Sequence, residues 1–256
     1  MGEFSGRSGA ALVVGGSGGL GQSITRMLAA RGCDVAVTYR SGEAAGLAAA
    51  SAAREWGVRA SAYALDVTSD EDAARVVDSV AEEFGGLHTL VHAAGPHVPM
   101  VHLSNVAPTT MAAQLAADAA GFFNLVHPAL PHLRQAHGCV VAVTTAATAR
   151  YPVRDGLSAA PKGAVEALVR ALAAEEGRFG VRVNCVGPGM LTDGMAARLI
   201  SSGDLSAEAL AVARGNIPLR RFGTATDIAE AVCFLASDRA GFISGQKLDV
   251  DGGYGV

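Results

Sequence analysis

A glycine-rich segment near the start of the chain has the composition of a phosphate-binding loop. It spans residues 15–21, directly after the apolar segment 11–14 and at the start of a helical pattern over 19–31. Glycine accepts positive φ angles and lets the backbone approach a pyrophosphate, and the N–H groups of the following helix attract anions. We expect phosphate contacts from Gly15, Ser17, Gly18, Gly19, Leu20 and Gly21.

Short apolar segments alternate with longer Ala-rich segments along the chain, which predicts strands alternating with helices. The expected strands are Ala11–Val14, Asp34–Thr38, Arg59–Ala64, Thr89–Ala93, Val140–Thr144, Arg182–Val186 and Lys247–Val250. The expected helices cover 19–31, 43–56, 70–84, 109–136, 160–178 and 225–236. This order predicts an α/β fold: a single doubly wound parallel sheet of about seven strands with helices on both faces. Ligands of such sheets bind where the strands end.

One domain over residues 10–256 is the simplest organisation, because neither a linker nor a low-complexity tract interrupts the pattern. Residues 1–9 lack the apolar core of a signal peptide, and we expect an N-terminal tail in which Gly2-Glu3-Phe4 is compatible with a vector remnant. The least regular segment, 189–216, is expected to form short helical pieces, either as a flap over the binding edge or as an ordinary surface excursion.

Several motifs at matching intervals resemble those of the short-chain dehydrogenase/reductase family. The glycine spacing is Gly15-x-x-x-Gly19-x-Gly21. Three later segments resemble the family's C-terminal signature: 234–238, 243–246 and 249–253. The resemblance implies a Rossmann-type fold and a pyridine nucleotide cofactor. Within the family, the sequence is most similar in its motifs to 3-oxoacyl-thioester reductases and related ketone reductases. It also implies cofactor contacts from Asp66-Val67, from His92-Ala93-Ala94-Gly95 in place of Asn-Asn-Ala-Gly, and from Pro188, Gly189 and Thr192.

The resemblance carries the family's four catalytic positions onto this chain with three changes. The lysine, which lowers the pKa of the catalytic tyrosine and holds the ribose, is Lys162, and the serine that polarises the carbonyl falls on Thr145. The asparagine that supports a proton relay falls on Asp118, an acidic group that would keep the Lys162 ammonium charged. The tyrosine that donates the proton falls on Ser158.

Serine is a poor substitute for the tyrosine, because an alkyl hydroxyl is a much weaker acid and its side chain is a ring shorter. We expect Ser158 instead to cap a helix that begins near residue 159, with Pro161 in its first turn. Other acids near this edge are His97, our first choice, and Tyr151, our second, with Asp155 on the same loop as Tyr151. Four other histidines are expected at helix ends or on the surface: His88, His127, His132 and His137.

The end of the second strand favours NADP(H) over NAD(H). An NAD site usually places a carboxylate there, whereas this chain has Arg40 and Ser41. A guanidinium suits a 2′-phosphate, although a solvated loop charge is the competing interpretation of Arg40.

Two functions remain open from the sequence. The first is an oxidoreductase that transfers hydride to a carbonyl, quinone or iminium group of a small molecule without the usual tyrosine. The second is a catalytically silent dinucleotide-binding protein that acts as a partner or sensor. A lyase or isomerase would be a third option, and no sequence feature supports it.

Composition narrows the partners. The 256 residues carry a net charge of −4, 50% are hydrophobic, and neither a basic stripe nor a membrane-length apolar run occurs. We therefore expect no nucleic acid, membrane or metal partner. Four dispersed cysteines in apolar runs indicate buried thiols in a cytoplasmic protein. The resemblance implies a homotetramer or homodimer built on the helices 109–136 and 160–178.

Overall fold

The computed structural model describes residues 2–95, 98–192 and 207–256, and within them seven parallel strands form one sheet. The strand order is β3-β2-β1-β4-β5-β6-β7, so the chain reverses its direction of travel across the sheet between β1 and β4. The strands are β1 (Ala10–Val14), β2 (Val35–Tyr39), β3 (Ala60–Ala64), β4 (Leu87–His92), β5 (Cys139–Val143), β6 (Arg182–Pro188) and β7 (Lys247–Val250). The predicted doubly wound sheet is therefore confirmed, with strand bounds within two residues of those expected.

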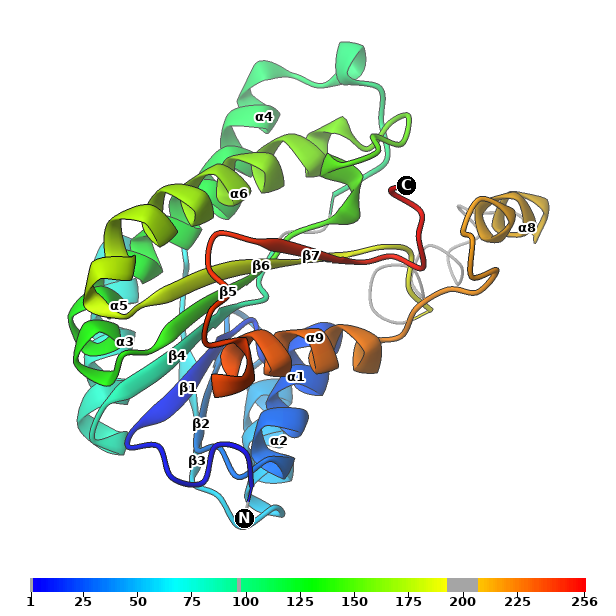
Figure 1. The fold of residues 1–256 in the computed structure, drawn as a ribbon. Helices are drawn as coiled ribbons and strands as arrows, with labels where there is room; N and C mark the ends of the chain where they lie inside the picture. The colour runs from blue at the N-terminus through cyan, green and yellow to red at the C-terminus, as the bar shows by residue number, and fades with distance from the viewer. Residues whose placement is uncertain (1, 96–97, 193–206) are drawn as a thin grey trace.

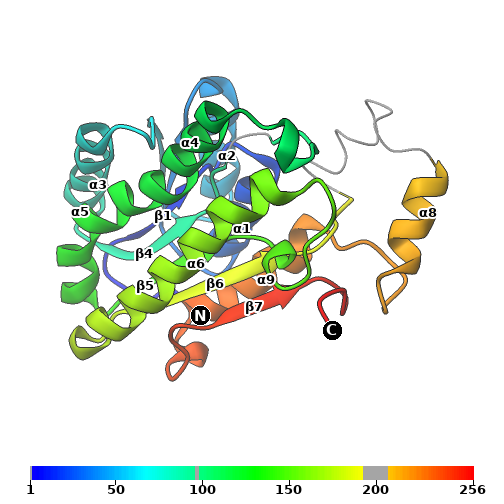
Figure 2. The ribbon, with the colours of Figure 1, turned by 90° about the horizontal axis from the view of Figure 1, so that it is seen from above.

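Helices cover both faces of the sheet, α1, α2 and α9 on one and α3, α5 and α6 on the other (Figure 1). The described helices are α1 (Gly19–Ala30), α2 (Glu43–Arg54), α3 (Asp70–Phe84), α4 (Pro108–Leu115), α5 (Gly121–Ala136), α6 (Gly156–Glu176), α8 (Ala207–Gly215) and α9 (Ala225–Ala236). Figure 2 shows the same layers from above, with α8 standing off from the body of the domain. No described helix is long and apolar enough to cross a membrane.

The strands are buried on both faces, which explains their continuous apolar sequence. In β1, Ala11 and Val13 join the core under α1 and α9, whereas Leu12 and Val14 join the core under α3 and α5. Successive strand side chains point to opposite faces, so only a sheet covered on both sides buries every residue of such a run. The four cysteines are all buried and unpaired, as expected.

The expected helix 109–136 is one helical run with a wider turn in its middle. Between α4 and α5 lies η2 (Ala116–Ala120), a π-helical turn that contains Asp118. A π turn inserts an extra residue and rotates the side chains that follow it. The Asp118 side chain is thereby buried below the run rather than exposed on it.

The start of α6 corrects the expectation for Ser158. The helix begins at Gly156 with Asp155 as its N-cap, so Ser158 is its third residue and Pro161 its sixth. The Asp155 carbonyl already accepts hydrogen bonds from the N–H groups of Ser158 (3.0 Å) and Ala159 (2.9 Å). Burial of Leu157 and Pro161 on the packed side of α6 offsets the hydrogen bond that proline cannot donate.

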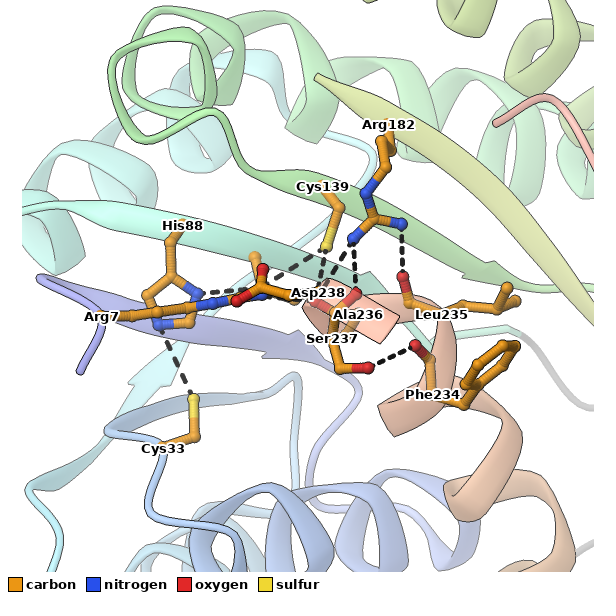
Figure 3. Close-up of polar contacts among 11 residues, drawn as sticks. Arg7, Cys33, His88, Cys139, Arg182, Phe234, Leu235, Ala236, Ser237 and Asp238 are labelled. Atoms are coloured by element: carbon orange, nitrogen blue, oxygen red, sulfur yellow. Dashed lines mark hydrogen bonds and ion pairs between the residues drawn. The ribbon is translucent and has the colours of Figure 1, made fainter. Parts of the chain in front are cut away.

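The N-terminal segment packs against the domain, which differs from the expected tail. Phe4 is 2% exposed within the core under α1 and α9. Arg7 donates to the Ala236 carbonyl at the end of α9 (3.0 Å), and Arg182 donates to the neighbouring Leu235 carbonyl (2.7 Å) (Figure 3). Guanidinium groups thus satisfy the last carbonyls of a helix, where a positive charge is favourable.

His88 also belongs to this polar network, and its predicted surface position is wrong. It lies on β4 and is 3% exposed, between Cys33 and Thr89 (Figure 3). Burial lowers the pKa of His88 from 6.5 to about 4. Sequence periodicity missed this because a histidine in a strand covered on both faces has no exposed side available.

The burial of His88 predicts acid lability. The unfolded chain binds a proton below pH 6.5 that the folded protein accepts only near pH 4, so stability present above pH 6.5 is lost through this window. Relative to a His88→Gln variant, the natural protein should lose about 3 kcal/mol more free energy of unfolding between pH 7.5 and 4. Urea unfolding across this range measures the difference, and parallel pH curves for the two proteins would contradict it.

Candidate active site at the carboxyl edge of the sheet

The predicted site residues come together because all paired strands are parallel, so their carboxyl ends share one edge. The glycine-rich loop follows β1, Arg40 and Ser41 follow β2, and Asp66 follows β3. The segment 93–95 follows β4, and Thr145 follows β5. Pro188 ends β6, with Gly189 directly after it.

The loop between β1 and α1 requires glycine at positions where backbones meet. Gly15 has φ +78°, and a Cβ there would lie 2.9 Å from the Ala94 backbone. A Cβ at Gly21 would lie 2.1 Å from the Gly15 carbonyl oxygen. Gly18 is the N-cap of α1 without a side-chain hydrogen bond, and no acidic residue occupies the first turn. This helix end is therefore built to receive an anion.

Two residues that the sequence analysis missed hold this edge in shape. The Thr38 hydroxyl on β2 accepts a hydrogen bond from the Gly15 N–H (3.1 Å), and Asn124 on α5 donates to the Val67 carbonyl (3.0 Å). Gly121 allows α5 to pack on the Val67 side chain, which a Cβ there would approach to 3.0 Å. The available signal was a polar residue inside an otherwise buried pattern, Thr38 being 2% exposed.

Lys162 and Asp118 form a buried ion pair at the centre of this edge. The Lys162 Nζ lies 2.7 Å from Asp118 Oδ1, and the two side chains are 13% and 2% exposed. Gly95 makes room for the pair, since a Cβ there would lie 3.1 Å from Nζ and 3.5 Å from Oδ1. Asp118, which the sequence analysis predicts at the asparagine position, is thus a direct partner of the lysine.

His92 lies behind this pair and is wholly enclosed. Its ring packs edge-on against the ring of Phe122, with 5.5 Å between the two ring centroids. Neither ring nitrogen of His92 has a hydrogen-bond partner among the described residues. Burial and the charge of Lys162 lower the pKa of His92 to about 3, so the ring is neutral. Ala93 and Ala94 continue from it to Gly95, and Ala93 donates its N–H to the Val14 carbonyl (3.0 Å).

Thr145 keeps a hydroxyl at the end of β5. Its Oγ1 accepts from the Ala147 N–H (3.1 Å) as the N-cap of η3 (Ala146–Thr148), which leaves its O–H free to donate. Below it, Thr148 donates to the Glu166 carboxylate (2.8 Å), and Lys247 lies 3.3 Å from the same carboxylate. This charged network ties the Thr145 turn to α6 and β7.

The alternative acids occupy different surroundings. The Tyr151 side chain is 68% exposed, and His97 lies outside the described residues. Ser158 is half-buried on α6, one turn before Lys162. Asp155 is half-buried, and burial raises the pKa of its carboxyl to about 6.

At the outer ends of the site, Arg40 is exposed and its charge helps to lower the pKa of Asp66. The larger cause of that shift is Thr68, whose N–H (2.9 Å) and hydroxyl (2.7 Å) both donate to Asp66. Past β6, the Gly189 N–H donates to Val250 and the Thr192 N–H donates to Gly223 (2.9 Å). Within the irregular segment 189–216, residues 193–206 lie outside the described residues.

A doubly wound sheet with a glycine-lined anion cradle and a buried lysine at its carboxyl edge defines a nucleotide-dependent oxidoreductase scaffold. The family model described as enoyl-(acyl carrier protein) reductase matches residues 14–255. The chain belongs to the short-chain dehydrogenase/reductase family, whose members are NAD(P)-dependent oxidoreductases.

Curated relatives resemble the chain over nearly its whole length. It is 36% identical over 245 residues to 2-(S)-hydroxypropyl-CoM dehydrogenase 3 of Xanthobacter autotrophicus, covering 94% of each chain. It is 33% identical over 250 residues to the 3-oxoacyl-(acyl-carrier-protein) reductase FabG of Staphylococcus epidermidis, covering 95% of this chain and 97% of that one.

Solved structures share the fold. A short chain dehydrogenase from Burkholderia cenocepacia in complex with NADP has a TM-score of 0.88 and 31% identity, covering 98% of this chain and 99% of that one. NAD+-bound xylitol dehydrogenase has a TM-score of 0.90 and 28% identity over the same shares. Structural neighbours therefore bind either dinucleotide.

The ion pair predicts an asymmetric response to substitution. Asp118→Ala leaves a mostly buried ammonium without its partner and should lower the free energy of unfolding by about 3 kcal/mol. Asp118→Asn retains an acceptor oxygen and should lose about 1 kcal/mol. Urea unfolding measures both, with Glu175→Ala, an exposed change on α6, as a control expected to stay within about 0.5 kcal/mol. An Asp118→Ala variant as stable as the control would contradict the pairing.

Proposed function

We propose that the protein is an NADP(H)-dependent, ketoreductase-like enzyme that transfers hydride to a carbonyl, quinone or iminium group of a small molecule without a catalytic tyrosine. The Lys162–Asp118 pair beside Gly95 carries the proposal, because it keeps a positive charge at the edge where the family binds its cofactor. Ser158 in the tyrosine position sets the condition that the acid must come from elsewhere.

The described residues fit a dinucleotide. Gly15 and Gly21 let the loop after β1 pack closely against the Ala94 backbone and on itself, and the uncapped start of α1 at Gly18 suits a pyrophosphate. In the proposal, residues 15–21 hold the phosphates, Asp66 and Val67 contact the adenine, and Lys162 holds the ribose. The segment 92–95 and Pro188, Gly189 and Thr192 border the nicotinamide, which supplies the hydride when bound.

Arg40 supports NADP(H) as the preferred cofactor. Arg40 is exposed directly after β2, and Ser41 follows it. Neither β2 nor residues 40–42 contain a carboxylate that could pair with Arg40. A guanidinium there can bind a 2′-phosphate in fork geometry, and Asp66 nearby limits the local positive charge.

On the substrate side, Thr145 donates its free O–H to the carbonyl oxygen and so polarises the bond. Asp118 holds the Lys162 ammonium in place through the 2.7 Å contact, which suits a ribose anchor better than a proton donor. After hydride addition to its carbon, an iminium group needs no proton on its nitrogen, whereas a ketone needs one on its oxygen, so iminium groups place the smallest demand on this site.

The second candidate is a catalytically silent dinucleotide-binding protein that acts as a partner or sensor. The observation in its favour is that Ser158 replaces the tyrosine while Tyr151, the nearest phenol in sequence, is 68% exposed. The same cradle would then bind the dinucleotide without turnover.

We also propose a homotetramer or homodimer, with α4, α5 and α6 at its interface. Leu115 and Phe123 on the first two helices are 38% and 43% exposed in the single chain, which fits a covered face. Light scattering on the purified protein measures the mass.

The cofactor assignment predicts that Arg40→Ala weakens NADPH binding by about 10-fold or more while NADH affinity stays within about twofold, since only NADPH carries the 2′-phosphate. Titration calorimetry measures both constants. Arg26→Ala, an exposed arginine on α1, is the matched control and should change neither. Equal losses for both dinucleotides would contradict the role of Arg40.

Turnover separates the two candidates. NADPH oxidation over a panel of ketones, quinones and iminium ions should exceed background for at least one class. A Ser158→Tyr variant tests the silent alternative, because it restores a phenol one turn before Lys162. Ketone reduction that appears only in this variant, with tight NADPH binding in both proteins, would overturn the enzymatic proposal.

A further inference from the structure

We propose that Asp155 is the proton donor that replaces the tyrosine, so that this site reduces ketones with a carboxylic acid instead of a phenol. This inference rests on the proposed function and names the acid that it lacks. It follows from the register of α6, from the cap geometry at its start and from the surroundings of the carboxyl.

The register of α6 places Ser158 and Lys162, spaced i and i+4, on one side of the helix, and Asp155 is the N-cap three residues before Ser158. Long helical side chains lean toward the N-terminus and cover the preceding turn. A tyrosine at 158 would therefore carry its hydroxyl toward the start of α6. With serine at 158, the ring is missing, and the next polar side chain toward the start of the helix is that of Asp155.

The carboxyl of Asp155 is not used for capping. An aspartate at an N-cap normally accepts a hydrogen bond from the second or third N–H of its helix, but here no side-chain cap bond forms. Only its backbone carbonyl participates, accepting from Ser158 and Ala159. The carboxyl thus forms neither a hydrogen bond nor an ion pair with the described residues.

The surroundings of this carboxyl favour its acid form. Leu103 of η1 (Leu103–Asn105) packs over the start of α6, where a Cβ on Gly156 would lie 2.7 Å from its side chain. Burial alone raises the pKa of Asp155 to about 6, well above that of a free aspartate. The charged or titratable groups of the adjoining elements are His102, Asp118, Arg150, Tyr151, Arg154 and Lys162. None of them contributes to this shift.

The step balances without further reactants. The carbonyl carbon accepts the hydride that reduced nicotinamide supplies, and the C=O π electrons move to oxygen, where a new O–H bond forms with the Asp155 proton. The Asp155 O–H bond breaks and leaves a carboxylate, which takes a proton from water before the next turnover. Thr145 orients the carbonyl, and Lys162 needs no proton transfer in this scheme.

The test compares ketone and iminium reduction by Asp155→Asn, because only the ketone needs the proton. The variant should lose about 100-fold or more in kcat with a ketone and keep iminium reduction and NADPH affinity within about twofold. In the natural protein, kcat with the ketone should fall as pH rises through about 6, where the acid form is lost, and Asp155→Asn should abolish this dependence. Asp155→Glu should restore part of the activity, and Glu175→Gln on the same helix is the control.

The outcomes are distinguishable. Ketone reduction retained within threefold by Asp155→Asn would overturn the role of Asp155 and leave the proposed function standing. Equal loss of ketone and iminium reduction would show a structural role and also overturn it. No turnover of any substrate by the natural protein, despite NADPH binding, would overturn the proposed function and this inference together.

Discussion

The buried ion pair between Lys162 and Asp118 is the constraint on which the site depends. The pair joins α6 to the π-helical turn before α5, near the end of β4. Gly95 leaves room for it, because a Cβ there would lie 3.1 Å from the Lys162 Nζ. An ammonium group that is only 13% exposed needs a fixed counter-charge, since an unpaired buried charge is costly. The pair therefore fixes the position of the Lys162 ammonium at the carboxyl edge, in front of His92, whose pKa is lowered by burial first and by the Lys162 charge second.

The proposed proton donor, Asp155, is a different group from the ion-paired Lys162. The Lys162 ammonium contacts the Asp118 carboxylate, and the motif comparison predicts that Ser158 replaces the phenol which a lysine tunes in the family arrangement. The Asp155 carboxyl gains its raised pKa from burial rather than from a neighbouring charge. The two carboxylates of this edge thus differ in their surroundings: Asp118 is ion-paired with Lys162, whereas Asp155 has no charged partner.

Much of the fold could be predicted from the chain. Apolar runs such as 11–14, Ala-rich helices between them and the glycines after β1 led to the correct sheet, and the ranges of α3 and α9 were predicted to the residue. Three expectations failed where packing overrode local signals. Asp155, not Ser158, is the N-cap of α6. His88 lies in a strand with no exposed face, and Phe4 packs in the core under α1 and α9.

The sequence by itself determined the class of protein and the place of the glycine-rich loop after the first strand, because spacing along strands and helices is a local property of the chain. Only the tertiary structure decided that Asp118 is the direct partner of Lys162, that Tyr151 faces solvent and that Asp155 is half-buried without a cap bond. The Lys162–Asp118 contact and the burial of Asp155 depend on segments tens of residues apart in the chain. They form only when the π-helical turn, the loop before α6 and the register of α6 are all in place.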